Sequence, residues 1–352
     1  MNRQITYAQA INEALQQAMT DDPNVICYGL GVPDPRGVFG TTVGLQEKFG
    51  VERVFDMPTA ENALTGVAIG AAMNGIRPVM THQRLDFFLL ALDQLINNAA
   101  KWHYMFDGQT AIPITIRLLL GRGWGQGPTH SQNLQALFAH IPGLKVVMPS
   151  TAADAKGLLL SSIFDDNPVI FLEHRWLHNQ VGAVPEGDFR LPLGQPALLS
   201  SGADLTIVSM SYMSVEALHA VRILAENGIG CDLIDLRTIK PLNWQPIFES
   251  VHRTGRLLAV DTGVAFGSIA SEIISRVSRD CFDDLKQAPW LLALPDFPTP
   301  TSPALTKGFY KRAEDIIDTA AAMLQRNLTG SELIDRGDVP HDVPGDWFKG
   351  PF

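Results

Sequence analysis

The feature that most constrains the fold of this chain is the alternation of short apolar runs with helical segments along most of its 352 residues. Examples of the runs are residues 25–28, 112–119, 144–147 and 169–172, which are short for helices and carry few polar residues. Apolar strands of this kind are typical of parallel sheets that helices cover on both faces. The alternation therefore predicts an α/β protein built on parallel sheets.

The alternation comes in two blocks, which predicts two domains. We expect the first domain over residues 1–182, a proline-containing linker over 183–200, a smaller α/β domain over 201–330 and a tail over 331–352. The tail is polar but ends with the aromatic residues Trp347, Phe348 and Phe352. Exposed terminal aromatics are unfavourable, so we favour a tail that wraps a neighbouring subunit over one that frays.

Composition argues against several classes of function. The net charge is −10 and there is no basic run, which argues against a nucleic-acid partner. No apolar run approaches the ~18 residues that would span a membrane. The cysteines Cys27, Cys231 and Cys281 are far apart in apolar surroundings, as expected of buried thiols in a reducing cytoplasm. Charged residues make up only 18%, which fits either a large core or a surface partly covered by another subunit.

Two polar segments suggest acid–base chemistry. The turn at 56–62 places Glu61 at the start of a helix rich in small residues, and the glycine-rich loop at 121–132 carries His130. A partly buried acid and a loop histidine form a proton-handling pair in outline. The alternatives are that Glu61 is an acid favoured by the helix dipole and that His130 is bonded to backbone.

Five segments together resemble one known family. They are residues 58–66, 93–101, 127–132, 140–147 and 235–242, and they occur in order across roughly residues 5–325. The chain resembles the beta subunit of the thiamine-diphosphate-dependent 2-oxoacid dehydrogenases, which include pyruvate, branched-chain oxoacid and acetoin dehydrogenases. The resemblance implies a transketolase-like pyrimidine-binding domain followed by a smaller transketolase C-terminal-like domain.

The resemblance also implies a reaction and residues to carry it. The reaction is oxidative decarboxylation of a 2-oxoacid with acyl transfer to a lipoyl domain. Glu61 matches the acid that shares a proton with the N1′ nitrogen of the cofactor's aminopyrimidine ring, and His130 matches a histidine at the mouth of the site. The remaining matches line the pyrimidine pocket: Thr59, Ala60, Gln83 and Phe87. Phe87 alone reads equally well as ordinary helix core.

Metal ions and partners follow from the same resemblance. In the family potassium is held largely by carbonyl groups, at positions that match Ile114, Ser162, Ile163, Asp165 and Asn167. An ordinary turn at the end of a helix is the alternative for this segment. The chain has no Gly-Asp-Gly motif, which in the family binds the cofactor's diphosphate through Mg²⁺. An alpha subunit is therefore expected to supply it, in an α2β2 assembly, with a lipoyl acyltransferase as a further partner.

The sequence departs from the family pattern at two places. The turn at 29–32 lacks the family's usual acid, and residues 81–86 differ from the usual pocket segment. In that segment His82 and Arg84 either bind an anionic or hydroxylated substrate group or pair with Asp86 or the alpha subunit. These differences leave the substrate open.

Two other functions remain open for the chain. It is either half of a stand-alone split thiamine-diphosphate lyase or transferase, or a non-catalytic assembly subunit, although retention of Glu61 weighs against the latter. In the second domain Asp235, Arg237 and Lys240 cluster after a strand, and we expect structural roles for them.

Overall fold

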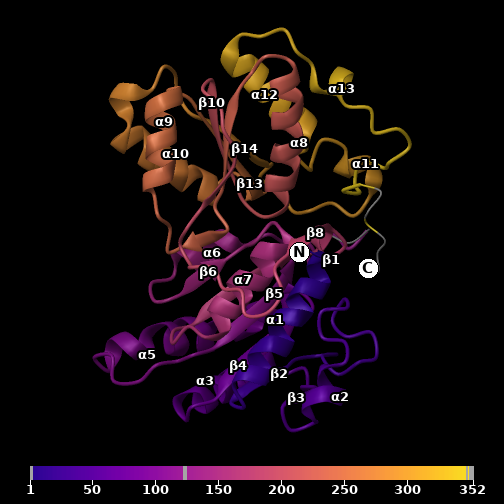
Figure 1. Cartoon of the computed structure of the whole chain (residues 1–352), viewed down its shortest axis with the longest axis vertical. Helices are drawn as coiled ribbons and strands as arrows, with labels where there is room; N and C mark the ends of the chain where they lie inside the picture. The colour runs from indigo at the N-terminus through magenta and orange to yellow at the C-terminus, as the bar shows by residue number, and fades with distance from the viewer. Residues whose placement is uncertain (1–2, 122–124, 346–347, 349–352) are drawn as a thin grey trace.

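Two sheets organise the chain, one below the other in Figure 1. The computed structural model describes residues 3–121, 125–345 and 348. The lower sheet has seven strands in the order β3 (Val54–Phe55), β2 (Val25–Tyr28), β4 (Arg77–His82), β5 (Thr115–Leu120), β7 (Val169–His174), β6 (Lys145–Val147) and β12 (Thr238–Lys240). All of its pairings are parallel except that of β12 with β6. The parallel α/β architecture predicted from the apolar runs is confirmed.

Helices cover both faces of this sheet (Figure 1). They are α1 (Tyr7–Asp21), α2 (Leu45–Phe49), α3 (Glu61–Met73), α6 (Gln135–His140) and α7 (Ala152–Ile163). Helix α1 begins with the capping box that its sequence predicts, because Thr6 Oγ1 accepts from the Gln9 amide and Gln9 Oε1 accepts from the Thr6 amide. Helix α1 packs against α7, and α3 packs against β4 and against the helical segment that follows it.

The segment after β4 is helical but irregular. It runs through α4 (Leu85–Phe88), a 3₁₀ turn (Leu89–Ala91), a π-helical stretch (Gln94–Ala99) and α5 (Ala100–Met105). The apolar residues of 85–102 favour one long buried helix, but the structure divides this segment into shorter helical pieces. Such π-helical stretches occur frequently at functional sites.

The upper sheet has five strands in the order β14 (Trp290–Leu294), β13 (Leu257–Val264), β10 (Leu205–Ser209), β11 (Cys231–Asp235) and β9 (Ala197–Ser200). Only β9 runs antiparallel, and it lies within residues 183–200, the predicted linker. The helices of this half are α8 (Tyr212–Glu226), α9 (Gln245–Thr254), α10 (Ile269–Asp280), α11 (Pro303–Thr306), α12 (Ala313–Leu324) and α13 (Gly330–Leu333). Short 3₁₀ turns lie at Arg175–Leu177 and Phe282–Asp284, and β1 (Arg3–Thr6) pairs with β8 (Val181–Val184).

Residues from the second half of the chain fasten the two sheets together. Strand β12 follows β11 of the upper sheet but pairs with β6 of the lower one. Beside it, Arg237 Nη1 donates to Asp154 Oδ1 at 3.0 Å, and Lys240 Nζ donates to the Ala139 and Ile141 carbonyls at 2.8 and 3.0 Å. Arg237 and Lys240 therefore have the structural roles expected from the sequence.

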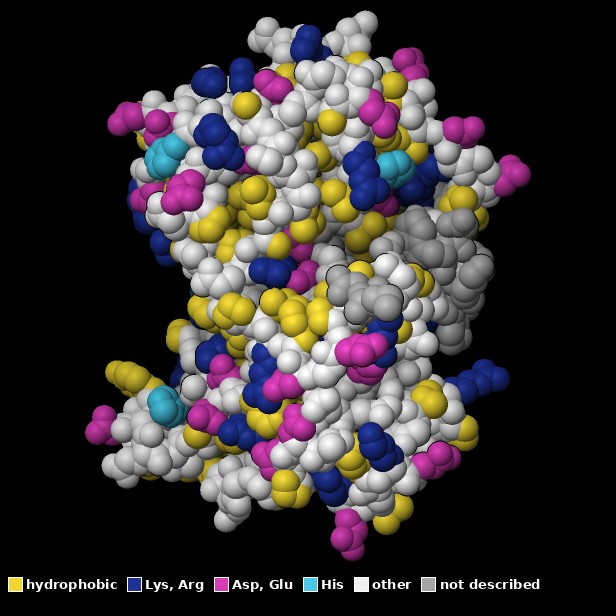
Figure 2. Space-filling view, in the orientation of Figure 1, with side chains coloured by type: hydrophobic (Ala, Val, Ile, Leu, Met, Phe, Trp, Pro, Cys, Tyr) yellow, Lys and Arg dark blue, Asp and Glu magenta, His cyan; other side chains and the backbone are white. Residues whose placement is uncertain are grey.

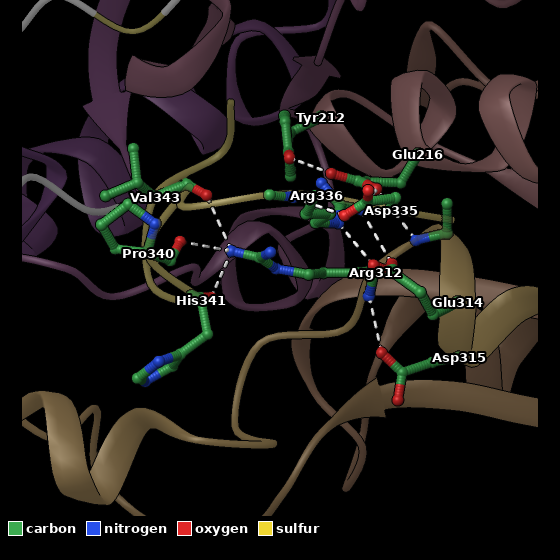
Figure 3. Close-up of polar contacts among 12 residues, drawn as sticks. Tyr212, Glu216, Arg312, Glu314, Asp315, Asp335, Arg336, Pro340, His341 and Val343 are labelled. Atoms are coloured by element: carbon green, nitrogen blue, oxygen red, sulfur yellow. Dashed lines mark hydrogen bonds and ion pairs between the residues drawn. The ribbon is translucent and has the colours of Figure 1, made fainter. Parts of the chain in front are cut away.

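The C-terminal tail folds back on its own chain (Figure 3). Arg336 Nη2 donates to Glu314 Oε2 at 2.8 Å and to Glu216 Oε2 at 2.9 Å. Arg312 donates to tail carbonyls, among them that of Val343 at 2.7 Å. Acids of α8 and α12 therefore anchor the described part of the tail on its own chain, and contact of the tail with a neighbouring subunit remains a prediction. Trp347 and Phe352 lie outside the described residues.

The surface mixes charges of both signs over the face shown in Figure 2, where apolar side chains gather near the junction of the two domains. The cysteines Cys27, Cys231 and Cys281 are buried free thiols, as expected. Among the described residues, no helix combines the length and apolar character needed to cross a bilayer.

Candidate active site

The candidate residues gather where the parallel strands of the lower sheet end. Strands β2, β4, β5 and β7 are neighbours running in one direction, so the segments that follow them meet at one edge of the sheet. Those segments include the turn after residue 28, the start of α4 and the loop that carries His130. Open α/β sheets bind their ligands in the crevice at this edge.

Glu61 opens helix α3 and is buried, with 9% of its surface exposed. Its carboxylate forms no hydrogen bond or ion pair with any other residue that the structure describes. The local fold is fixed by Thr65, whose hydroxyl donates to the Glu61 carbonyl at 2.8 Å. Thr59 is exposed and Ala60 is half-buried just before the helix. A carboxylate that lacks an internal donor on a largely buried residue fits a ligand that brings an N–H or a proton.

The turn after β2 is fixed by two side chains from other segments. Gln83 Nε2 donates to the Leu30 carbonyl at 3.0 Å, and the Gly31 amide donates to Asp56 Oδ1 at 3.1 Å. A Cβ on Gly31 would lie 2.6 Å from Gln83 Nε2, and its φ is +74°, so glycine is required there. Asp56 thus brings a carboxylate to the turn that lacks the family's usual acid, which the sequence reasoning missed. Asp56 is the first residue of the turn at 56–62, and this position was the feature of the sequence that could have identified it.

His130 lies against the start of helix α4. Its ring meets the Phe87 ring edge-on, with centroids 5.3 Å apart and planes at 89°. The Thr129 hydroxyl lies 3.0 Å from His130 Nδ1. The other ring nitrogen, Nε2, is then the one that can exchange a proton with a substrate. Residues 122–124 of the predicted glycine-rich loop lie outside the described residues.

Arg84 points inward rather than to the surface. It is 5% exposed, and its Nη2 donates to Gln126 Oε1 at 2.6 Å while Nη1 donates to the Gln83 carbonyl at 3.2 Å. Burial lowers the pKa of Arg84, although Asp86 nearby opposes the shift. The alternative of a surface pair between Arg84 and Asp86 is wrong, because Asp86 Oδ1 accepts from Gln132 Nε2 at 2.7 Å instead.

His82 lies in an apolar environment. It is 3% exposed, meets the Phe88 ring at 4.9 Å, and its Nε2 has no hydrogen-bond partner among the residues described. Burial lowers the pKa of His82 to about 3, so the ring is neutral at physiological pH. A neutral buried imidazole does not supply the positive charge that an anionic substrate group needs.

The predicted potassium segment meets a cation of the protein itself. Arg77 Nη1 donates to the carbonyls of Ile163 and Asp165 at 3.3 and 3.1 Å. Its Nη2 also pairs with Asp166 Oδ1 at 2.6 Å. The turn therefore presents carbonyl oxygens as its sequence suggests, and a guanidinium group already uses two of them. The sequence reasoning missed Arg77, which is 86 residues away from Ile163 along the chain.

The other predicted potassium positions lie close by. The Ile114 carbonyl accepts from the Val169 amide at 3.0 Å, and the Ser162 carbonyl accepts from the Thr115 hydroxyl at 3.0 Å. The Asn167 amide donates to a side-chain oxygen of the same turn. These bonds bring the end of α7 and the strands β5 and β7 together, so the five predicted positions form one neighbourhood.

Two hollows lie near the junction of the domains. A groove of about 810 Å³ between α6 and α10 is lined by residues that include His140, Lys240 and Trp244, and neither Glu61 nor His130 lines it. A smaller cleft of about 310 Å³ is lined by Pro128 and Gln132, together with residues of the 294–299 segment. Pro128 and Gln132 belong to residues 125–134, called here the histidine loop because they carry His130. The histidine loop is thus bordered by a cleft toward the second domain.

Comparison with known protein families gives two matches in the order of the two domains. Residues 3–180 match the transketolase pyrimidine-binding domain, and residues 194–316 match the transketolase C-terminal domain. A split-gene transketolase solved as an inactive β4 tetramer superposes with a TM-score of 0.73 over 92% of this chain and 99% of that chain, at 22% identity. At that identity the superposition establishes the fold alone.

Curated relatives share about two residues in five with this chain over nearly its whole length. The acetoin:2,6-dichlorophenolindophenol oxidoreductase subunit beta of Cupriavidus necator is 40% identical over 94% of the chain and 100% of the relative. The 2-oxoisovalerate dehydrogenase subunit beta of Bacillus subtilis is 41% identical over 87% and 94%. The pyruvate dehydrogenase E1 component subunit beta of Rickettsia felis is 40% identical over 90% and 97%.

Proposed function

This chain belongs to the family of beta subunits of thiamine-diphosphate-dependent 2-oxoacid dehydrogenases, and we propose that it forms the decarboxylating enzyme of such a system together with an alpha subunit. The proposed reaction is oxidative decarboxylation of a 2-oxoacid with transfer of the acyl group to a lipoyl domain. The observation that carries the proposal is Glu61, a largely buried residue whose carboxylate has no hydrogen-bond partner among the described residues.

Thiamine diphosphate, when bound, supplies a nucleophilic carbon that a protein side chain cannot provide. Glu61 would hold a proton at its carboxylate oxygen, opposite the ring nitrogen of the cofactor. Its buried position supports this role because a low local dielectric strengthens such a bond. Phe87 would offer its flat face to the ring, and Thr59, Ala60 and Gln83 would complete the wall on this side.

His130 would move protons to and from the substrate through Nε2. Its Nδ1 lies beside the Thr129 hydroxyl, and its ring rests on Phe87, so the imidazole is held from two directions. Histidine suits this task because its usual pKa of about 6.5 lies near the pH at which enzymes operate.

An alpha subunit would complete the site in an α2β2 assembly. The chain has no Gly-Asp-Gly motif, so Mg²⁺ and the diphosphate would be held mainly by the partner. Among the described residues no cluster of histidine, cysteine and acidic side chains is arranged to hold a metal ion. A lipoyl acyltransferase would accept the acyl product.

A potassium ion would bind at the turn that follows α7. It would share the Ile163 and Asp165 carbonyls with Arg77, since each carbonyl oxygen has two lone pairs. Melting curves of the assembled enzyme in potassium chloride and in choline chloride test this. A higher Tm in potassium is expected, and equal curves at matched ionic strength would leave this turn to the protein's own cations, Arg77 and Lys145.

The function is tested with the enzyme co-expressed from both subunits. Carbon dioxide release from a panel of 2-oxoacids is measured with an artificial electron acceptor and with a lipoyl domain. Glu61→Gln should lower the rate about 10²- to 10⁴-fold while α2β2 assembly persists, and Glu47→Gln, an exposed acid of α2, should have no effect. Full activity of the Glu61→Gln enzyme would remove this residue from the mechanism. Transfer to an aldehyde acceptor in place of the lipoyl domain would indicate a lyase or transferase.

A further inference from the structure

We propose that the first turn of α4 is a clamp on the histidine loop, with Arg84 and Asp86 as positioning residues for His130. The proposal rests on the proposed function, because it assigns the clamp to the histidine that would move protons in that reaction. Neither residue would touch the substrate, and each would act through a glutamine of the loop.

Three contacts join the turn to the loop, and together they bracket His130. Arg84 Nη2 donates to Gln126 Oε1 at 2.6 Å on the N-terminal side of the histidine. Gln132 Nε2 donates to Asp86 Oδ1 at 2.7 Å on the C-terminal side. Between them the His130 ring meets the Phe87 ring at 5.3 Å. Three residues of one turn therefore hold the loop on both sides of the histidine and at the histidine itself.

The loop needs such support because it has little structure of its own. Residues 125–134 contain no helix or strand, and the backbone bond from the His130 amide to the Gly127 carbonyl is long at 3.4 Å. Gly125 and Gly127 have φ of +62° and +64°, values that side chains rarely adopt. A segment of this kind has many accessible conformations, so side-chain bonds must select the one that presents the histidine.

The clamp is itself firmly placed. The Arg84 guanidinium lies over the Phe39 ring at 5.3 Å and also donates to the Gln83 carbonyl. These two contacts, both outside the histidine loop, fix the position of the guanidinium. Gln83 in turn holds the Leu30 carbonyl, which ties the clamp to the turn after β2. Both residues lie within residues 81–86, the segment that differs from the family's usual pocket sequence.

Misplacement of a reacting group by about 1 Å can cost on the order of 10²-fold in rate. Arg84→Met, which keeps the side-chain length without the hydrogen bonds, should therefore lower kcat about 10- to 100-fold. Thiamine diphosphate affinity should stay within about twofold, because Glu61 and Phe87 are untouched.

The experiment uses the enzyme assembled with its alpha subunit and combines kinetics with hydrogen exchange. Arg84→Met, Gln126→Met and the double variant form a cycle, and Arg84→Lys tests rescue by a shorter donor. Amide exchange of the 125–134 peptide is followed by mass spectrometry in the absence of substrate. Asp93→Asn is the matched control, since this exposed acid after α4 bonds to Asn97, outside the loop.

The expected result is faster amide exchange of the 125–134 peptide in Arg84→Met. The kcat of the double variant should be no lower than that of Arg84→Met alone. Asp86→Ala should act likewise and Asp86→Asn should not, because asparagine keeps the acceptor for Gln132. Unchanged exchange in Arg84→Met and in Asp86→Ala, or multiplicative losses in the cycle, would overturn the clamp. Failure of the proposed function would be distinct, because the unmodified enzyme would then release no carbon dioxide from any 2-oxoacid.

Discussion

A buried ion pair in the lower sheet offers the sharpest test of the energetics of this fold. Arg117 of β5 and Glu173 of β7 are both fully buried, with Nε–Oε1 at 2.6 Å and Nη2–Oε2 at 3.0 Å. Arg117 also donates to the hydroxyls of Thr81 and Thr41 at 3.2 and 3.0 Å. Burial alone would raise the pKa of Glu173, but the Arg117 charge, His178 Nε2 at 3.4 Å from Oε2 and the Arg117 hydrogen bonds lower it, so the carboxylate is ionised.

The change Glu173→Gln removes the negative charge and leaves the guanidinium buried without a counter-ion. Breaking a buried pair in this way costs about 3–5 kcal/mol. A domain of this size loses about 2–4 °C of Tm per kcal/mol, so we expect a fall of roughly 10 °C. The double variant Arg117→Met, Glu173→Leu removes both charges. It should lose only about 1–2 kcal/mol, because the Thr81 hydroxyl loses the guanidinium donor and His178 Nε2 loses the Glu173 oxygen, while Thr41 Oγ1 still donates to the Val38 carbonyl.

Urea and thermal unfolding of the three proteins at pH 7, followed by circular dichroism, give the measurement. The control is Glu249→Gln on the exposed face of α9, which should leave Tm within about 1 °C. The reasoning would be refuted if the double variant were as unstable as Glu173→Gln. That result would mean that packing, rather than an uncompensated charge, accounts for the loss.

Three further outcomes follow from the structure. Burial lowers the pKa of His82 to about 3, so the unfolded chain takes up a proton below its usual pKa of about 6.5 while the folded protein does not. The contribution of His82 to the free energy of unfolding is present above pH 6.5 and falls by about 1.4 kcal/mol per pH unit toward pH 3. His82→Phe should therefore reduce the dependence of the urea midpoint on pH between pH 7 and 5, and an unchanged dependence would contradict this. Gly143→Ala should lower Tm strongly, since its Cβ would lie 1.9 Å from the Ala100 carbonyl oxygen, whereas Gly75→Ala meets no atom within 4 Å and should cost only about 1 kcal/mol of backbone strain; equal losses would refute the steric account. Arg336→Met should free the tail and speed its proteolysis, and unchanged cleavage would show that Arg336 does not anchor it.

Much of the fold could be predicted because its signals are local. The apolar runs at 25–28, 112–119, 144–147 and 169–172 predicted four strands of the lower sheet, and the Thr6–Gln9 spacing predicted the start of α1. The burial of Glu61 at the start of α3 also follows from adjacent residues. The irregular course of residues 85–105 was not predictable, because the 3₁₀ and π turns depend on what the segment packs against.

The surroundings of the candidate site were less predictable. Residues 81–86 were recognised as unusual, but the partners of Arg84 and Asp86 were not. Asp86 lies two residues from Arg84 along the chain, yet Arg84 bonds to Gln126, 42 residues away. Asp56, which follows β3, accepts from the Gly31 amide 25 residues away, so this contact also depends on how the strands pack side by side.

The sequence by itself determined the kinds of elements, their order, an acid at the start of a helix and a histidine in a glycine-rich loop. Periodicity, caps and glycines act within a few residues, so they can be read along the chain. Only the tertiary structure decided that Arg77 occupies carbonyls at the end of α7, that β12 crosses to the lower sheet and that the tail returns to its own chain. Those contacts join residues tens of positions apart, and they depend on how the packed layers bring side chains together.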